Sequence, residues 1–163
     1  MDSSNPAAAT PQQTTNGAIA LTGDFLRPMV VSLDELRRHA SVTAGPFDLH
    51  CYTTKRFIRT VDSYRGVRLT DLIEMAGLRE DRPGDFKRTI FIALAHDGYA
   101  VTFSWHELFN TVVGERAIVA CEMSGQPLGI DAGAPVLFSA ADILPAPRHV
   151  TRLASIVARV VHL

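Results

Sequence analysis

The sequence predicts an α+β domain in which a mixed β-sheet is combined with short helices. Two capping boxes, from Ser32 to Glu35 and from Ser104 to Glu107, each mark the start of a short helix. The apolar run 89–95 has the length of a central strand, and the turn residues 96–98 return the chain. Because short helices are interleaved with hairpin strands, an α+β arrangement is favoured over a doubly wound sheet.

The first half of the chain predicts three strands and two helices. Residues 18–21 alternate weakly and predict a strand that ends at Gly23, and residues 29–31 predict a short edge strand. Helix 33–40 places Leu33 and Leu36 inward. Strand 47–53 places Phe47, Leu49 and Cys51 on one face, and a polar, basic stretch over 54–65 follows it. Helix 69–76 ends at Gly77, which can adopt a positive φ.

The second half continues with hairpins and one more helix. A charged loop over 79–87 precedes strand 89–95, and residues 99–103 form the returning strand. The second capping box begins a helix that runs to about residue 109. Strands are then predicted over 117–122, 135–138 and 156–161, with a turn at 124–125.

The composition is that of one globular domain without a bias towards anionic partners. The chain has 163 residues, and its 16 basic and 17 acidic residues give a net charge of −1. A chain of this length can bury one sizeable core. The balanced charge argues against nucleic-acid binding. No apolar run approaches the roughly 20 residues of a membrane-spanning helix, so no membrane insertion is expected.

The first 17 residues differ from the rest of the chain. They are rich in Ser, Thr, Gln, Asn, Ala and Pro and contain no aromatic or branched aliphatic residue. Such a segment cannot bury enough apolar surface to become ordered, so we predict a disordered tether over 1–17 and a folded domain over 18–163. The segment is not itself a secretory signal, but it resembles the stretch that follows a removed one. We therefore expect an exported, periplasmic protein, with the cytoplasm as the alternative.

The two cysteines, Cys51 and Cys121, are too few for a disulfide framework and lack zinc-finger spacing. A single disulfide between them stays open as an alternative in an oxidising compartment. Cys121 lies in an apolar strand and is expected in the core. Cys51 has two interpretations: an inert core thiol, favoured by its place on the apolar face of a strand, or a metal-binding thiolate.

Six short motifs follow one another in a characteristic order between residues 18 and 162. The motifs are Leu-Thr-Gly at 21–23, Gly-Val-Arg-Leu-Thr-Asp-Leu at 66–72, Asp-Gly-Tyr at 97–99, Gly-Gln-Pro-Leu at 125–128, Gly-Ala-Pro at 133–135, and a terminal pattern of Val150, Leu153 and Ile156. This order resembles the oxidoreductase molybdopterin-binding domain of the sulfite oxidase family, and the resemblance implies that family's fold.

The resemblance also implies candidate site residues. In the family a cysteine thiolate binds molybdenum, which is held by the dithiolene of a phosphorylated pterin, and a soft thiolate suits this metal. Cys51 stands in the place of that cysteine. Arg56 stands in the place of a substrate-binding arginine, and Tyr99 in that of an active-site tyrosine. If the fold is that of the family, these three residues are expected to converge at one site.

The family's cofactor-anchoring residues are replaced in this sequence. Its His-Gly-x-Pro-x-Arg segment has Ala132 in place of the histidine and Leu137 in place of the arginine, and Thr151 replaces a terminal lysine. A phosphate binds through charge-assisted donors worth roughly 1.5–3 kcal/mol each, so their loss weakens binding by several orders of magnitude. Arg148 or Arg152 is the cation that could compensate.

These observations lead to three functional hypotheses. The first is a ligand-binding module without redox chemistry, which binds a non-phosphorylated pterin through Cys51, Arg56, Tyr99 and Arg148 and signals ligand occupancy to a protein partner. The alternative is a molybdopterin-dependent oxidoreductase, with Cys51 as the molybdenum ligand, Arg56 binding an anionic substrate, and a partner for electron transfer. A haem or metabolite carrier that uses one of the six scattered histidines is a third hypothesis.

Overall fold

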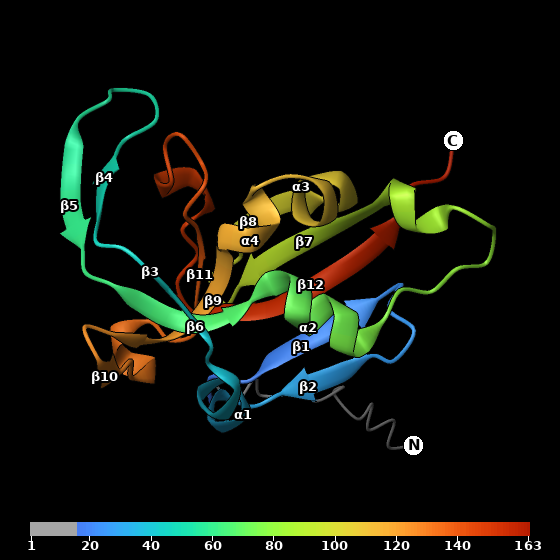
Figure 1. Cartoon of the computed structure of the whole chain (residues 1–163), viewed down its shortest axis with the longest axis horizontal. Coiled ribbons are helices and arrows are strands. Elements are labelled where there is room, and N and C mark those ends of the chain that lie inside the picture. Colours follow the sequence, from blue (N-terminus) through green and yellow to red (C-terminus); the bar gives the residue numbers. More distant parts are fainter. Residues whose placement is uncertain (1–15) are drawn as a thin grey trace, which may run out of the picture.

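The computed structural model describes residues 16–163, which form two five-stranded β-sheets, a two-stranded hairpin and short helices (Figure 1). The α+β class with a mixed sheet is therefore confirmed. The predicted tether over 1–17 lies outside the described residues, except for Asn16 and Gly17. Within the described part of the chain, no helix has both the length and the apolar character needed to cross a membrane.

The first sheet has the strand order β2-β1-β12-β7-β8. β1 and β12 are parallel, and every other neighbouring pair in this sheet is antiparallel. The predicted hairpin between β7 and β8 is present, and the carboxylate of Asp97 accepts a hydrogen bond of 2.9 Å from the backbone N–H of Tyr99 in its turn. The strands are β1 (Ile19–Gly23), β2 (Met29–Val31), β7 (Thr89–Ala95), β8 (Ala100–Ser104) and β12 (Leu153–Val160).

The second sheet is built around β6 and β9. β6 pairs with β3 along one edge and with β9 along the other. Both β10 and β11 pair with the edge of β9 that faces away from β6. β6 and β9 approach closely at Gly66, where a Cβ would lie 1.9 Å from the carbonyl oxygen of Val119, so only glycine fits. The strands are β3 (Val42–Ala44), β6 (Tyr64–Arg68), β9 (Ala117–Met123), β10 (Gln126–Pro127) and β11 (Val136–Ser139); β4 (Phe47–His50) and β5 (Phe57–Val61) form the separate hairpin.

Both predicted capping boxes are present at helix starts. The hydroxyl of Ser32 accepts from the backbone N–H of Glu35 at 3.1 Å, and that of Ser104 accepts from Glu107 at 3.0 Å. α1 and α2 pack against β6 and β9, and α3 packs against β8. The helices are α1 (Leu33–His39), α2 (Leu69–Ala76), α3 (Trp105–Asn110) and α4 (Val113–Arg116), with 3-10 turns η1 (Asp85–Arg88), η2 (Ile130–Ala132) and η3 (Ala146–Arg148).

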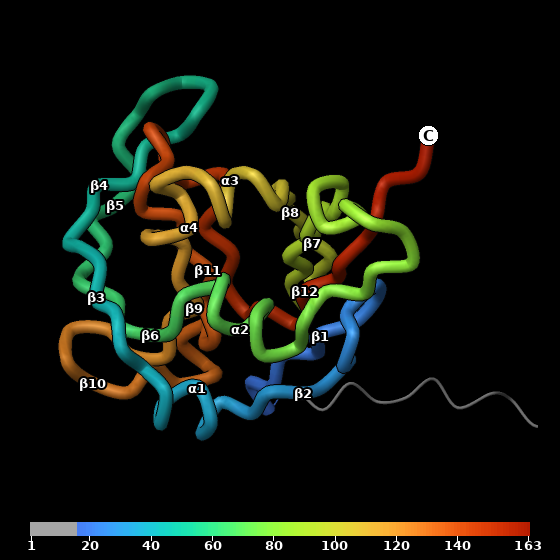
Figure 2. Tube along the Cα trace, turned by 45° about the vertical axis from the view of Figure 1, so that its right-hand side comes forward, coloured from blue at the N-terminus to red at the C-terminus, as the bar shows by residue number. Residues whose placement is uncertain are grey.

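One hydrophobic core joins the two sheets. Phe91 and Ile156 of the first sheet and Leu137 and Phe138 of the second are all fully buried in it. Figure 2 separates the two groups of strands and shows the β4–β5 hairpin projecting beyond them. The base of this hairpin is anchored in the core by Phe47, whose ring centroid lies 4.5 Å from that of Phe138.

The region 42–68 differs most from its sequence prediction. Three strands in this region, β3, β5 and β6, were not predicted. In the case of β5 the reason is that it is almost wholly exposed and lacks the alternation of a half-buried strand. Its pairing with β4 makes it a strand. The strand predicted over 47–53 ends at His50, because the chain turns at residues 52–54.

Candidate functional site

Cys51 lies directly after β4, in the turn that leads to β5. Its backbone N–H donates to the carbonyl oxygen of Arg56 at 2.8 Å, and the N–H of Lys55 donates to the carbonyl oxygen of Cys51, also at 2.8 Å. The Cys51 thiol is partly exposed and free. The expectation that Cys51 is buried in the core is therefore wrong, whereas Cys121 is fully buried as expected and is also free.

The turn stabilises the thiolate form of Cys51. The hydroxyl and the backbone N–H of Thr54 lower the pKa of this thiol by hydrogen bonding, and the backbone of Thr53 and the charge of Lys55 lower it further. Because the thiolate is the nucleophilic and metal-binding form of cysteine, the turn supplies the kind of ligand that soft metals prefer.

Tyr99 and Arg148 lie together at a second place, around η3. The hydroxyl of Tyr99 donates to the carbonyl oxygen of Pro147, the residue that precedes Arg148. Tyr99 itself is 46% exposed. Among the hydrogen bonds and ion pairs of residues 16–163, none joins this pair to Cys51 or to the exposed Arg56. The predicted site residues thus form two groups, one in the hairpin turn and one at η3.

The guanidinium of Arg148 is already engaged by acidic side chains. It donates to the carboxylate of Asp142 at 2.6 and 2.7 Å and to that of Glu107 at 3.0 Å. It also donates to the carbonyl oxygen of Thr102 at 3.1 Å and lies 4.2 Å above the ring of Phe103. These partners raise the pKa of Arg148 and neutralise its charge, which leaves little capacity for an anionic ligand.

A cluster of Arg59, Tyr64 and His149 lies between the hairpin and η3, and sequence reasoning missed it. The Tyr64 hydroxyl and Nε2 of His149 are 2.9 Å apart, and both rings pack edge-on against Phe138. Burial lowers the pKa of His149 to about 4, with a smaller contribution from the charge of Arg59, so the imidazole is neutral at pH 7. No sequence signal joins these residues, because they come from β5, β6 and the end of η3.

The positions that correspond to cofactor anchors hold no cation. Leu137 is fully buried in β11, where its backbone exchanges two hydrogen bonds of 2.9 Å with Val150. Ala132 and Thr151 are exposed and uncharged. Arg152 lies nearby, with its guanidinium 3.4 Å from the carbonyl oxygen of Asp131. A thiolate at Cys51 is the kind of ligand that a metal group needs, whereas Ala132, Leu137 and Thr151 offer no charge-assisted donor to a phosphate.

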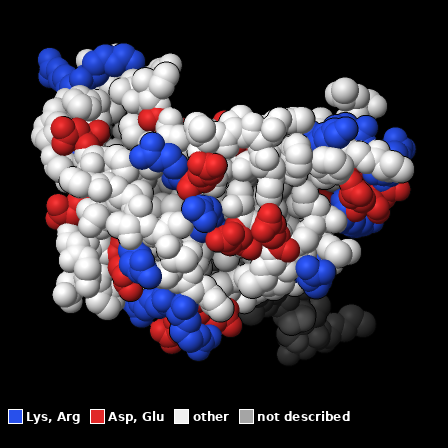
Figure 3. All heavy atoms as spheres, in the orientation of Figure 1, with Lys and Arg blue, Asp and Glu red and all other residues white. Residues whose placement is uncertain are grey.

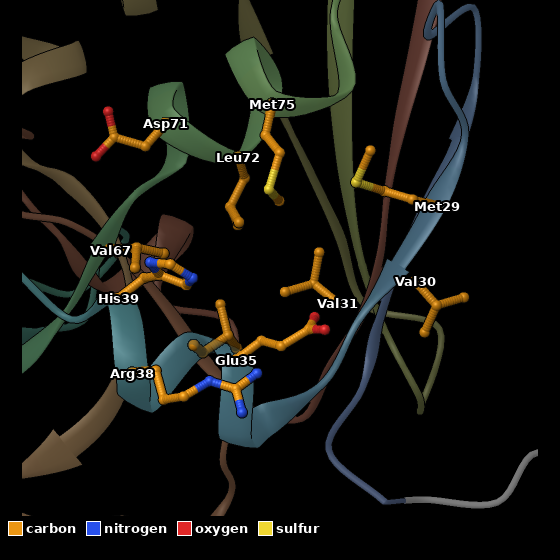
Figure 4. Close-up of a pocket in the computed structure, with 11 residues that line it drawn as sticks. Met29, Val30, Val31, Glu35, Arg38, His39, Val67, Asp71, Leu72 and Met75 are labelled. Atoms are coloured by element: carbon orange, nitrogen blue, oxygen red, sulfur yellow. The ribbon is translucent and has the colours of Figure 1, made fainter.

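A separate cavity of about 510 Å³ lies between β2, α1 and α2 (Figure 4). Its buried floor includes Leu36 and Leu72, Met29 and Met75 flank it, and the Glu35 carboxylate points into it. None of the predicted site residues lines this cavity. In the described part of the chain, no three His, Cys, Asp or Glu side chains are placed to hold a metal ion.

Comparisons with known proteins agree with this architecture. The family model described as oxidoreductase molybdopterin binding domain matches residues 7–143. Among solved structures, the sulfane dehydrogenase SoxCD from Paracoccus pantotrophus is similar over 89% of this chain, with a TM-score of 0.60 and 17% sequence identity. This chain spans only 39% of the length of that one, and the likeness concerns the fold. A search of curated proteins found no match.

Proposed function

Because the chain belongs to the oxidoreductase molybdopterin-binding domain family, we propose that it binds a pterin without a phosphate and works as a ligand-binding module without redox chemistry. The ligand would contact the hairpin turn through Cys51 and Arg56 and approach Tyr99 at η3. A change in the hairpin on binding would then be recognised by a protein partner. Export to the periplasm is part of this proposal, and it rests on the composition of residues 1–17.

The position and burial of Leu137 are the observation that supports the proposal most strongly. It occupies the position of the family's anchoring arginine, and it is fully buried among apolar side chains. Arg148, the candidate replacement, is bound by Asp142 and Glu107. A phosphate would lose charge-assisted hydrogen bonds at both positions, whereas an uncharged pterin ring does not need them.

Titration with a reduced pterin such as tetrahydrobiopterin tests the proposal. We expect a dissociation constant in the micromolar range or below by isothermal calorimetry, and an absence of heat at these concentrations would overturn the proposal. Arg56→Ala should weaken binding about tenfold, the loss expected for one charge-assisted hydrogen bond. Arg79→Ala, which changes an exposed arginine paired with Asp81 in a distant loop, should leave binding unchanged.

The lowered pKa of Cys51 favours a second candidate, a molybdenum-dependent oxidoreductase. Here the Cys51 thiolate would hold the metal and Arg56 would bind an anionic substrate. Metal analysis of protein from a host that makes molybdopterin separates the candidates, because only this one requires stoichiometric molybdenum. Cys51→Ser should abolish metal loading under this candidate, and it should preserve pterin binding under the first.

A further inference from the structure

The β4–β5 hairpin carries exposed apolar side chains at its free end. We call residues 51–59 the hairpin tip. Within it Tyr52 is 63% exposed, Phe57 58% and Ile58 54%. In both backbone views the hairpin projects away from the two sheets (Figures 1 and 2). Large apolar side chains gathered on a projecting element mark a surface that meets another apolar phase.

A bulge in β5 helps to present these side chains. Leu49 pairs with Arg59, but the next residue of β4, His50, pairs with Phe57, so Ile58 is the extra residue. Such a bulge re-aims the residues beside it. Phe57 consequently shares a face with His50, with their ring centroids 5.8 Å apart, while Leu49 on the opposite face is buried. The exposed apolar residues are therefore held outward by the backbone.

The hairpin tip is also basic. It contains Lys55, Arg56 and Arg59, and residues 51–61 contain no acidic side chain. The other 13 basic and 17 acidic residues leave a net charge of −4 on the rest of the chain. Figure 3 shows blue Lys and Arg atoms at the upper left end, where the hairpin lies, with red atoms lower on the molecule. An anionic surface would thus attract the tip and repel much of the remainder.

We propose that the hairpin tip docks on the surface of an anionic lipid bilayer. The apolar side chains of Tyr52, Phe57 and Ile58 enter the interfacial region, and Lys55 and Arg56 bind lipid phosphates. Tyrosine is favoured at this depth because its ring is apolar and its hydroxyl is polar. A narrow projecting hairpin can enter the fluid surface of a lipid bilayer without a preformed site. An acidic protein partner, in contrast, would need a groove that matches the shape of the hairpin. The proposal shares Arg56 with the proposed pterin site, but the variants that test it change Lys55, Phe57 and Ile58, which that site does not use, so either proposal can fail alone.

Vesicle co-sedimentation of the full chain tests this docking. Vesicles of phosphatidylcholine with about 30% phosphatidylglycerol should bind the protein more strongly than phosphatidylcholine alone, because each cation near an anionic surface contributes about a fivefold gain in partition. Raising the NaCl concentration from about 50 to about 500 mM should weaken binding by screening. An equal affinity for both vesicle types, or binding to neither, would overturn the proposal and leave an acidic protein as the partner of the tip.

Matched variants locate the contact. Lys55→Glu should lower partition into anionic vesicles by more than about tenfold, since a favourable charge becomes a repulsive one. The double variant Phe57→Thr, Ile58→Thr keeps strand propensity and should also lose about tenfold or more in partition, because it removes two apolar side chains that enter the bilayer interface. If this double variant binds like the wild type, adsorption is purely electrostatic and docking by apolar entry is overturned.

Two control variants change the same properties elsewhere. Val30→Thr alters a strand residue of β2 that is 66% exposed, and Arg38→Glu reverses an exposed charge on α1. Both should bind vesicles like the wild type, and a loss equal to that of the tip variants would contradict a site at the hairpin. Phe57→Trp adds a reporter whose fluorescence should shift to shorter wavelength with anionic vesicles only.

Discussion

The hydroxyl of Tyr64 lies 2.9 Å from Nε2 of His149, and the two rings are nearly parallel, with centroids 5.9 Å apart. This contact joins β6 to the segment that follows η3. Arg59, from the hairpin that carries Cys51, acts electrostatically on both rings. The partly buried neutral imidazole of His149 makes the stability of this contact depend on pH.

His149 should make the protein less stable as the pH falls from about 6.5 to about 4. Its pKa is about 4 in the folded chain and near 6.5 when unfolded, so over this interval the unfolded chain binds more protons and acidification favours unfolding. The full shift corresponds to at most about 3 kcal/mol. Urea denaturation at pH 7, 6 and 5 measures the effect.

His149→Gln removes the titrating group and keeps a side chain that can hydrogen-bond Tyr64. We expect its stability to depend less on pH between 6.5 and 4.5 than that of the wild type. His106→Gln, at an exposed position of α3, is the control and should follow the wild-type profile. Identical pH profiles for His149→Gln and the wild type would contradict the assigned role of His149.

Cys51 should react with iodoacetamide faster than an unperturbed thiol at pH 7, because its lowered pKa increases the thiolate fraction. Mass spectrometry of the native protein should find Cys51 modified and Cys121 protected, since Cys121 is buried and burial raises its pKa. Thr54→Val removes the hydroxyl that lowers the pKa most and should slow the reaction. Equal rates for both cysteines would show that the turn does not activate Cys51.

The helices α1 and α3 were predictable from local sequence signals, whereas β5, the strand that follows Cys51, was not. The capping boxes at Ser32 and Ser104 predicted their helices correctly because a cap is a local set of hydrogen bonds. β5 was missed because its side chains are exposed and only its backbone pairing defines it as a strand. Such pairing depends on a partner strand and leaves no periodic signal.

The candidate site was predictable only in part. Motif order named Cys51 and Arg56, and the structure places both in one turn. The ion pairs of Arg148 with Asp142 and Glu107 were not predicted. Asp142 lies 6 positions and Glu107 lies 41 positions before Arg148 in the sequence, and these side chains meet only in the folded chain. A cation in a sequence is a candidate ligand until its own partners are known, and those are set by tertiary contacts.

Arg148→Met should destabilise the protein by about 2–3 kcal/mol, because it leaves the partly buried carboxylate of Asp142 without its partner. Urea denaturation measures the change. Adding Asp142→Leu to this variant should restore part of the loss, since no unpaired charge then remains. Arg79→Met breaks an exposed pair with Asp81 and should cost less than about 0.5 kcal/mol. Equal costs for the two single variants would contradict the structural role of Arg148.

Leu137→Arg, which restores the family's anchoring arginine, should destabilise the protein by more than about 4 kcal/mol. Leu137 is fully buried between β9 and Val150, so the introduced charge would have neither water nor an acidic partner. The exposed positions should behave differently, and Ala132→His and Thr151→Lys should each change stability by less than about 0.5 kcal/mol. Urea denaturation followed by circular dichroism compares the three.

Leu137→Met keeps the apolar volume and should cost less than about 1.5 kcal/mol, which separates the effect of charge from that of substitution. If Leu137→Arg folds with the stability of Leu137→Met, then position 137 can reach a polar surface and a phosphate-binding arginine could act there. That result would remove the main support for a phosphate-free ligand. A large cost for the arginine alone means that the apolar packing of β11 has replaced the anchor, and that one substitution cannot restore it.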